Sequence, residues 1–205
     1  MKGLILKDFY STVSGALKIL VFLIAVYGVL FYVDEDITFG WFICIMILTM
    51  QTLSSFTYDD YYKWDRYALG LPVTRREMVN SKYALGALLI GLGSVLSLAI
   101  MLIIAFIKGY TNVGEHVMFI VFSASVAFIY LGIVLPLVFK LGAEKARVLM
   151  SVLFIIPFLL FFSFNSFNQT SMKVSDIYYV APIVAAVVFI ISSRISMAIY
   201  NAKEF

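Results

Sequence analysis

Charged residues are scarce in this chain, and that scarcity sets its class. Only 13% of the 205 residues are charged and 63% are hydrophobic, and the mean hydropathy is +1.01. Soluble domains carry about 25% charged residues. With so few polar side chains the protein cannot cover a water-facing surface, so the composition excludes a soluble domain and indicates an integral membrane protein.

Cysteine and histidine are almost absent too. Cys44 is the single cysteine and lies inside an apolar run, which excludes an internal disulfide, a thiolate metal site and a redox pair. His116 is the single histidine and starts another apolar run, with no cluster of carboxylates beside it to complete a metal site. Both shortages disfavour a membrane-embedded enzyme.

Two further absences concern energy. The chain has no phosphate-binding loop of the GxxxxGK[ST] type, so any ATP-driven work must take its energy from another polypeptide. The apolar runs carry no charged residue near their middles, which argues against ion or proton coupling within this chain. We therefore expect no catalytic residue, cofactor or metal in this chain, and no nucleic-acid partner.

Six apolar runs are long enough to cross a bilayer, which takes about 20 residues. The first run leaves through an acidic stretch without a small-residue cleavage site, so we predict an uncleaved span rather than a signal peptide. Alternating β-barrel patterning is absent, so the spans are expected to be helices in one membrane domain, residues 1–205. The predicted spans are 16–33, 39–57, 83–107, 116–139, 147–166 and 177–199.

Cationic residues predict how these spans are oriented. Thirteen Lys and Arg residues fall on one side of the predicted membrane and only Lys108 and Lys173 on the other. Since cytoplasmic loops carry the excess of Lys and Arg, both termini are predicted to be cytoplasmic. The acidic turn 34–36 then faces outward.

The segment between the second and third spans, residues 58–82, is the longest predicted cytoplasmic stretch, and we call it the corner segment. Asp59 or Asp60 is expected to cap a short helix that runs through Leu69, with Tyr61, Trp64 and Ala68 on one side. Gly70 and Pro72 are expected to end this helix. Thr74 and Glu77 then form a T-x-x-E capping box that starts the next helix at Arg75.

The corner segment has two interpretations. It could lie among lipid headgroups, with its aromatic rings in the interfacial belt and its arginines on phosphates. It could also dock a soluble partner, since Trp, Tyr and Arg dominate protein interfaces. The interspersed acidic residues favour a shaped protein cleft over lipid, which needs only cations.

Residues 56–83 follow the pattern F-x-Y-D-D-x-x-K-W-D-x-Y-x-x-x-L-P-V-x-R-x-x-x-V-x-x-K-Y. Together with an N-terminal KGLILKDFY and six spans, this pattern resembles bacterial type-2 ABC exporter permeases. Within that family the likeness is to small half-transporter permeases that export phenol-soluble modulins and antimicrobial peptides. The likeness covers nearly the whole chain in topology, and its specific part is this one string.

The resemblance implies a multi-pass protein of the bacterial plasma membrane, working as a dimer or with a close relative above two ATP-binding subunits that hold ATP and Mg²⁺. Residues 1–18 would form an amphipathic elbow helix with Leu4, Leu6 and Phe9 on its apolar side. The corner segment would be the coupling helix, and a second contact would involve Lys140, Glu144 and Lys145, although these could form a plain basic turn. The implied contacts with the ATP-binding subunit are Tyr58, Asp59, Asp60, Lys63, Trp64, Asp65, Arg66, Tyr67, Leu71, Pro72, Arg75, Arg76 and Glu77.

Phenylalanines crowd the fifth predicted span. They could form a translocation wall for an amphipathic peptide or a lipid, or they could face membrane lipid. The candidate wall residues are Phe154, Phe158, Phe161 and Phe162.

Small residues four apart in the third and fourth spans suit close helix packing, either within the bundle or between two copies. These pairs are Ala87 with Gly91, Gly93 with Ser97, and Ser123 with Ala127.

Three functional hypotheses follow. The first is the membrane subunit of an ATP-driven exporter of amphipathic or hydrophobic peptides. The second is a non-transporting anchor, an assembly or sensory partner that docks a cytoplasmic ATPase or kinase through the same segment. The third, a membrane enzyme, is disfavoured by the lack of charge inside the spans.

Overall fold

The computed structural model describes residues 3–12, 21–22, 38–68, 70, 72–108, 113–142, 145, 153, 155, 157, 159 and 175–202. Within these residues all regular secondary structure is helical. Most of the first and fifth predicted spans lies outside the described residues, and so do all four phenylalanines of the candidate wall and Glu144.

Four helices are long and apolar enough to cross a membrane among the residues described. They are α2 (Thr38–Tyr61), α4 (Arg75–Lys108), α5 (Val113–Leu141) and α7 (Ser175–Asn201), and the short helix α3 (Trp64–Ala68) follows α2. They match the second, third, fourth and sixth predicted spans. The 34 residues of α4 extend about 50 Å, well beyond the bilayer's hydrocarbon core of about 30 Å. This helix is therefore longer than a span across the core requires.

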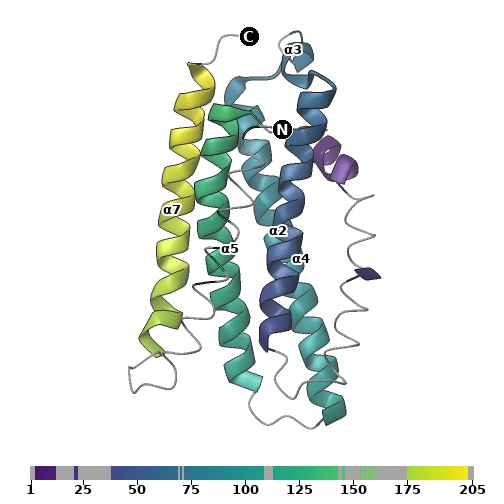
Figure 1. Ribbon diagram of the computed structural model, residues 1–205, viewed down its shortest axis with the longest axis vertical. Helices are drawn as coiled ribbons and strands as arrows, with labels where there is room; N and C mark the ends of the chain where they lie inside the picture. Colours follow the sequence, from purple (N-terminus) through teal and green to yellow (C-terminus); the bar gives the residue numbers. More distant parts are fainter. Residues whose placement is uncertain are drawn as a thin grey trace.

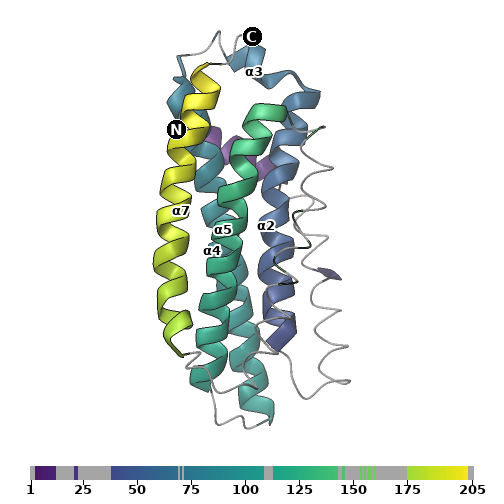
Figure 2. The same cartoon turned by 60° about the vertical axis from the view of Figure 1, so that its left-hand side comes forward.

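The long helices run up and down side by side (Figures 1 and 2). The C-terminal ends of α2, α5 and α7 lie at the same end of the bundle as the start of α4. The start of α5 and the end of α4 lie at the opposite end. This arrangement matches the alternation that the cation pattern predicts, while the assignment of the charged end to the cytoplasm stays a prediction.

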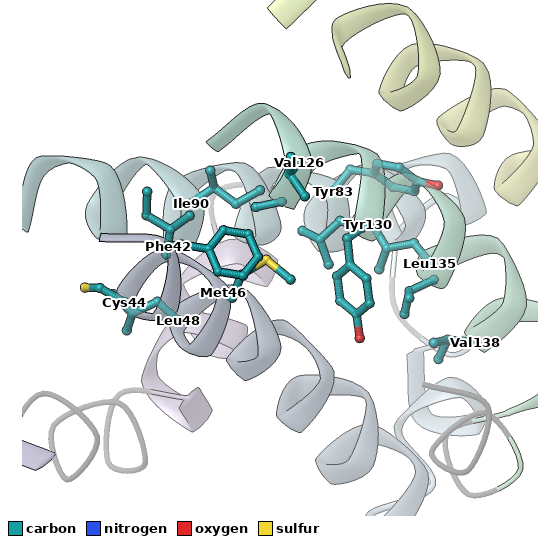
Figure 3. Packing of buried hydrophobic residues seen from close by; sticks show 14 of the residues in the cluster. Phe42, Cys44, Met46, Leu48, Tyr83, Ile90, Val126, Tyr130, Leu135 and Val138 are labelled. Atoms are coloured by element: carbon teal, nitrogen blue, oxygen red, sulfur yellow. The ribbon is translucent and has the colours of Figure 1, made fainter. Parts of the chain in front are cut away.

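The core lies where α2, α4 and α5 meet (Figure 3). Phe42 and Ile45 of α2 and Leu131 of α5 are fully buried. Gly93 brings α4 close to α2, because a Cβ placed on it would lie 3.2 Å from the Cα of Ile45. Gly91 faces open space instead. Of the predicted small pairs, Gly93 therefore packs within the bundle, against the second span.

Polar side chains join α4 to α7 inside the bundle. The Tyr83 hydroxyl lies 2.6 Å from the Ser192 Oγ and 2.7 Å from the Ser196 Oγ. Interhelical hydrogen bonds of this kind fix which faces meet, because apolar contacts between helices are not favoured over contacts with lipid. The outer faces of α4 and α7 carry exposed apolar side chains such as Phe106 and Ile183, as expected for lipid-facing helices.

Residues 3–12 form a helical segment beside the charged end of α2 (Figure 1). Its faces differ from the predicted amphipathic pattern, because Asp8 and Thr12 are buried with Leu4 while Leu6 and Tyr10 are exposed. The carboxylate of Asp8 turns inward because it has a cationic partner there. The course of this segment along the membrane surface stays a prediction.

Candidate functional site

The first part of the corner segment, where α2 ends and α3 begins, differs from the prediction. Helix α2 continues through Asp59 and Asp60 to Tyr61, so neither aspartate caps the short helix. Lys63 has a φ of +51°, which turns the chain out of α2 before α3 begins at Trp64. Tyr61 therefore belongs to the end of α2 and is 78% exposed, whereas Ala68, which we predicted on the same side, is buried.

The second half of the corner segment forms as predicted. Helix α3 ends at Ala68, and the Gly70 N–H donates to the Tyr67 carbonyl at 3.1 Å. The Thr74 N–H donates to Glu77 Oε2 at 3.0 Å, and the Glu77 N–H approaches Thr74 Oγ1 at 3.3 Å. This reciprocal capping box starts α4 at Arg75.

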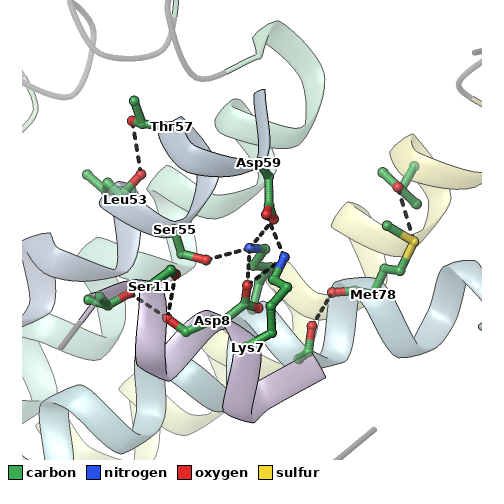
Figure 4. A network of polar contacts seen from close by, with 12 residues as sticks. Lys7, Asp8, Ser11, Leu53, Ser55, Thr57, Asp59 and Met78 are labelled. Carbon is green, nitrogen blue, oxygen red and sulfur yellow. Dashed lines mark hydrogen bonds and ion pairs between the residues drawn. The ribbon is translucent and has the colours of Figure 1, made fainter. Parts of the chain in front are cut away.

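Four charged side chains meet at the base of the corner segment, and we call them the charge ring: Lys7, Asp8, Asp59 and Lys82. The Lys7 Nζ lies 3.1 Å from Asp8 Oδ1 and 2.5 Å from Asp59 Oδ1. The Lys82 Nζ lies 2.9 Å from the same Asp8 oxygen and also contacts Asp59 Oδ2. Figure 4 shows Lys7, Asp8 and Asp59 turned toward one another.

The charge ring is largely shielded from solvent. The side chains of Asp8 and Lys82 are 2% and 8% exposed, and that of Asp59 is 14% exposed. The Lys82 ammonium also donates to Ser55 Oγ at 2.5 Å and lies 4.9 Å from the centre of the Phe56 ring. Two positive and two negative groups balance, so the ring is neutral overall, with only Lys7 partly exposed.

Two predicted contact residues are held by this chain itself. The Lys7 Nζ lies 4.1 Å from the centre of the Trp64 ring, a cation–π contact that fixes α3 against residues 3–12. The Arg75 guanidinium donates to the Asn201 carbonyl at 2.7 Å, at the last turn of α7. Trp64 and Arg75 thus brace the corner segment from within.

The turn after α5, which we predicted as a second contact with the ATP-binding subunit, lies next to the corner segment. A Cβ placed on Gly142, just after α5, would lie 3.9 Å from Asp60 Oδ2. Lys140 and Lys145 are exposed. A cavity of about 40 Å³ beside the charge ring is lined from every described helix of this end, by Leu4, Asp60, Trp64, Met78, Val138 and Tyr200 among others.

The outer surface of the corner segment is rich in exposed aromatic rings. Tyr61, Tyr62 and Tyr67 are 78%, 71% and 64% exposed, and Tyr61 and Tyr62 contact each other edge to face at 5.0 Å between ring centres. The side chains of Asp65 and Arg66, and residue 71, lie outside the described residues. The other exposed members of the predicted contact set are Tyr58, Asp60, Lys63, Pro72 and Arg76.

A larger cavity of about 420 Å³ lies between α4, α5 and α7, toward the end of the bundle away from the charge ring. Its lining is almost entirely apolar. Its two serines, Ser94 and Ser125, donate to carbonyls of their own helices. Among the described residues no group of three or more His, Cys, Asp or Glu side chains is placed to hold a metal ion.

These observations define a multi-pass helical membrane protein with a rigid, aromatic-rich corner at its charged end. The family model of the ABC-2 family transporter proteins matches residues 3–201. The chain belongs to this family, which makes it a membrane permease subunit of an ABC transporter and implies an ATP-binding partner subunit. No curated protein and no solved structure matches the chain.

Proposed function

We propose that this permease exports amphipathic or hydrophobic peptides, with energy from a separate ATP-binding subunit that docks on the corner segment. Two copies, or this chain and a close relative, would form the membrane core above two ATP-binding subunits. The observation that carries the docking proposal is the group of exposed tyrosines on a braced base. The narrower likeness to peptide-exporter permeases stays a prediction.

Rigidity makes this surface suitable for docking. Tyrosine offers a large contact area with little conformational freedom to lose, and tyrosines are frequent binding hot spots. Trp64 and Arg75 hold the segment on residues 3–12 and α7, so less ordering is required when a partner binds. Asp60 and Lys63 at the rim offer charge partners of both signs.

The mechanism that we propose follows from the connection between the corner segment and α4. ATP binding would draw the two ATP-binding subunits together and move the corner segments docked on them. The corner segment includes the first turns of α4, which begin at the capping box, so α4 would move as well. Differential contact of the corner in the two nucleotide states would shift the bundle between conformations.

The apolar cavity between α4, α5 and α7 supports the proposal that the cargo is hydrophobic. Its volume of about 420 Å³ is nearly three times the cavity of about 150 Å³ that admits benzene. The serine hydroxyls at its wall donate to their own helices, so the lining offers few donors for a sugar or an ion. Because α4 forms one wall, movement of the corner segment would change the shape of the cavity.

Docking is tested by co-purification of the ATP-binding subunit with the variant Tyr61→Ser/Tyr62→Ser. We expect retention to fall strongly, because the loss of one hot spot of about 2 kcal/mol weakens binding about 30-fold. Tyr179→Ser is the control, since Tyr179 is 64% exposed at the opposite end of the bundle. Equal retention by the double variant and the control would refute docking through these tyrosines and favour the lipid-headgroup interpretation.

Transport is tested with inside-out vesicles that contain the permease and its ATP-binding subunit. We expect ATP-dependent uptake of a labelled amphipathic peptide, and none with a polar peptide of the same length. Stable binding of the ATP-binding subunit without uptake of any amphipathic peptide would contradict export and support the non-transporting anchor.

A further inference from the structure

The charge ring joins three parts of the chain that are far apart in sequence. Lys7 and Asp8 come from residues 3–12, Asp59 from the end of α2 and Lys82 from the third turn of α4. Each member contacts two members of opposite charge, so the contacts close into a ring. Asp59 and Lys82 lie near the two ends of the corner segment, and residues 3–12 therefore clamp its base.

Stability alone is a poor reason to shield three charges from solvent and a fourth in part. The desolvation of two ion pairs offsets much of their attraction, and apolar replacements of similar size often leave stability unchanged or higher. What a closed ring does provide is a fixed relative position, because any sliding of one helix leaves a buried charge without its partner. The cation–π contact of Lys7 with Trp64 extends the same constraint to α3.

We propose that Lys7 and Asp8 are positioning residues of the coupling machinery, and that residues 3–12 move with the corner segment and α4 as one unit. The proposal rests on the docking function above, because it assigns the ring a role in transmitting the movement of the ATP-binding subunit. Loss of the ring would uncouple ATP hydrolysis from transport even where the protein stays folded.

The first test uses the permease alone in lipid nanodiscs. Spin labels on Tyr10→Cys and Asn80→Cys report the distance between residues 3–12 and α4, and the buried Cys44 does not compete for the label. We expect one narrow distance distribution with the ring intact and a broad one with Asp8→Asn or Lys82→Met. Narrow distributions in both variants would overturn the positioning role. This test does not depend on any ATP-binding subunit.

The second test uses the complete transporter and compares stability with coupling. Each single variant leaves the ring with one excess charge, so both the melting temperature and the peptide moved per ATP should fall. The double variant Asp8→Asn/Lys82→Met restores neutrality, and we expect its melting temperature to recover while the peptide moved per ATP stays several-fold below that of the unmodified transporter. Recovery of both quantities together would show that the ring only stabilises the fold.

Two further variants, one milder change to the ring and one control, complete the second test. Lys7→Gln is a milder change, because the Lys7 side chain is 29% exposed, and it should lower coupling with less effect on melting. Ser11→Ala is the matched control on the same helix, since the Ser11 hydroxyl donates to the Asp8 backbone carbonyl and not to a charged side chain of the ring. If the unmodified permease fails to bind an ATP-binding subunit, the proposed function fails while the nanodisc result still decides whether the ring positions residues 3–12.

Discussion

At the scale of single residues, the corner segment is held by a local capping box and by ion pairs between residues far apart in sequence. The capping box of Thr74 and Glu77 could be predicted because its two residues are three positions apart. The pairing of Asp8 with Lys82 could not, since 74 positions separate them and no local signal connects them. Asp59 shows the same limit, because its residue type predicts a helix cap, whereas α2 continues past it to Tyr61.

Thr74→Ala tests the capping box. Removal of an N-cap hydroxyl should cost about 1 kcal/mol of local stability, and the first turn of α4 should fray where it joins the corner segment. We expect ATP hydrolysed per peptide moved to rise more than protein abundance falls. Thr57→Ala is the control, because the Thr57 hydroxyl donates to a carbonyl of its own helix. A loss of abundance that matches the loss of coupling would mark Thr74 as a folding element only.

At the scale of helices, the apolar runs predicted which segments cross the membrane and the cation pattern predicted their alternation. The end of α2 differs from its prediction, because polar sequence continues this helix to Tyr61, whereas α4 starts at Arg75 as the capping box predicts. Which faces meet was harder to predict, because every face of a membrane helix is apolar. Gly93 shows this, since its spacing predicted close packing but not that α2 would be its neighbour.

Gly93→Ala and Gly91→Ala form a matched pair on one helix. Both changes raise helix propensity by about 1 kcal/mol, so the difference between them isolates packing. The new methyl group at position 93 meets the backbone of Ile45, and we expect an overpacking cost of about 1–3 kcal/mol. The melting temperature in detergent should therefore fall for Gly93→Ala relative to Gly91→Ala. Equal melting temperatures would show that α2 and α4 are not in close contact at this point.

At the scale of the whole molecule, the sequence predicts a neutral bundle with charge at one end. The structure adds the contacts that connect the charged end to the apolar bundle. The corner segment is held by residues 3–12 through the charge ring and by α7 through Arg75, while α4 leads from it to the apolar cavity. These connections could not be predicted from composition, because they depend on which helices become neighbours.

Ala124→Phe tests the cavity as part of the cargo path. Ala124 lines the cavity, and a phenylalanine there should fill part of its volume of about 420 Å³. We expect peptide uptake to fall several-fold while the ATP-binding subunit still co-purifies, because the corner segment is untouched. Ala99→Phe, on an exposed face of α4 outside the cavity lining, is the control. Uptake that falls equally in the two variants would argue against the cavity as a cargo site.

The most direct measurement of the central claim is site-specific photo-crosslinking in the intact membrane. A benzophenone side chain at position 61 should crosslink to the ATP-binding subunit, and the same group at position 179, at the opposite end, should not. Crosslinks from position 61 to lipid alone, with the ATP-binding subunit present and both with and without ATP, would contradict the assignment of this corner as its docking site.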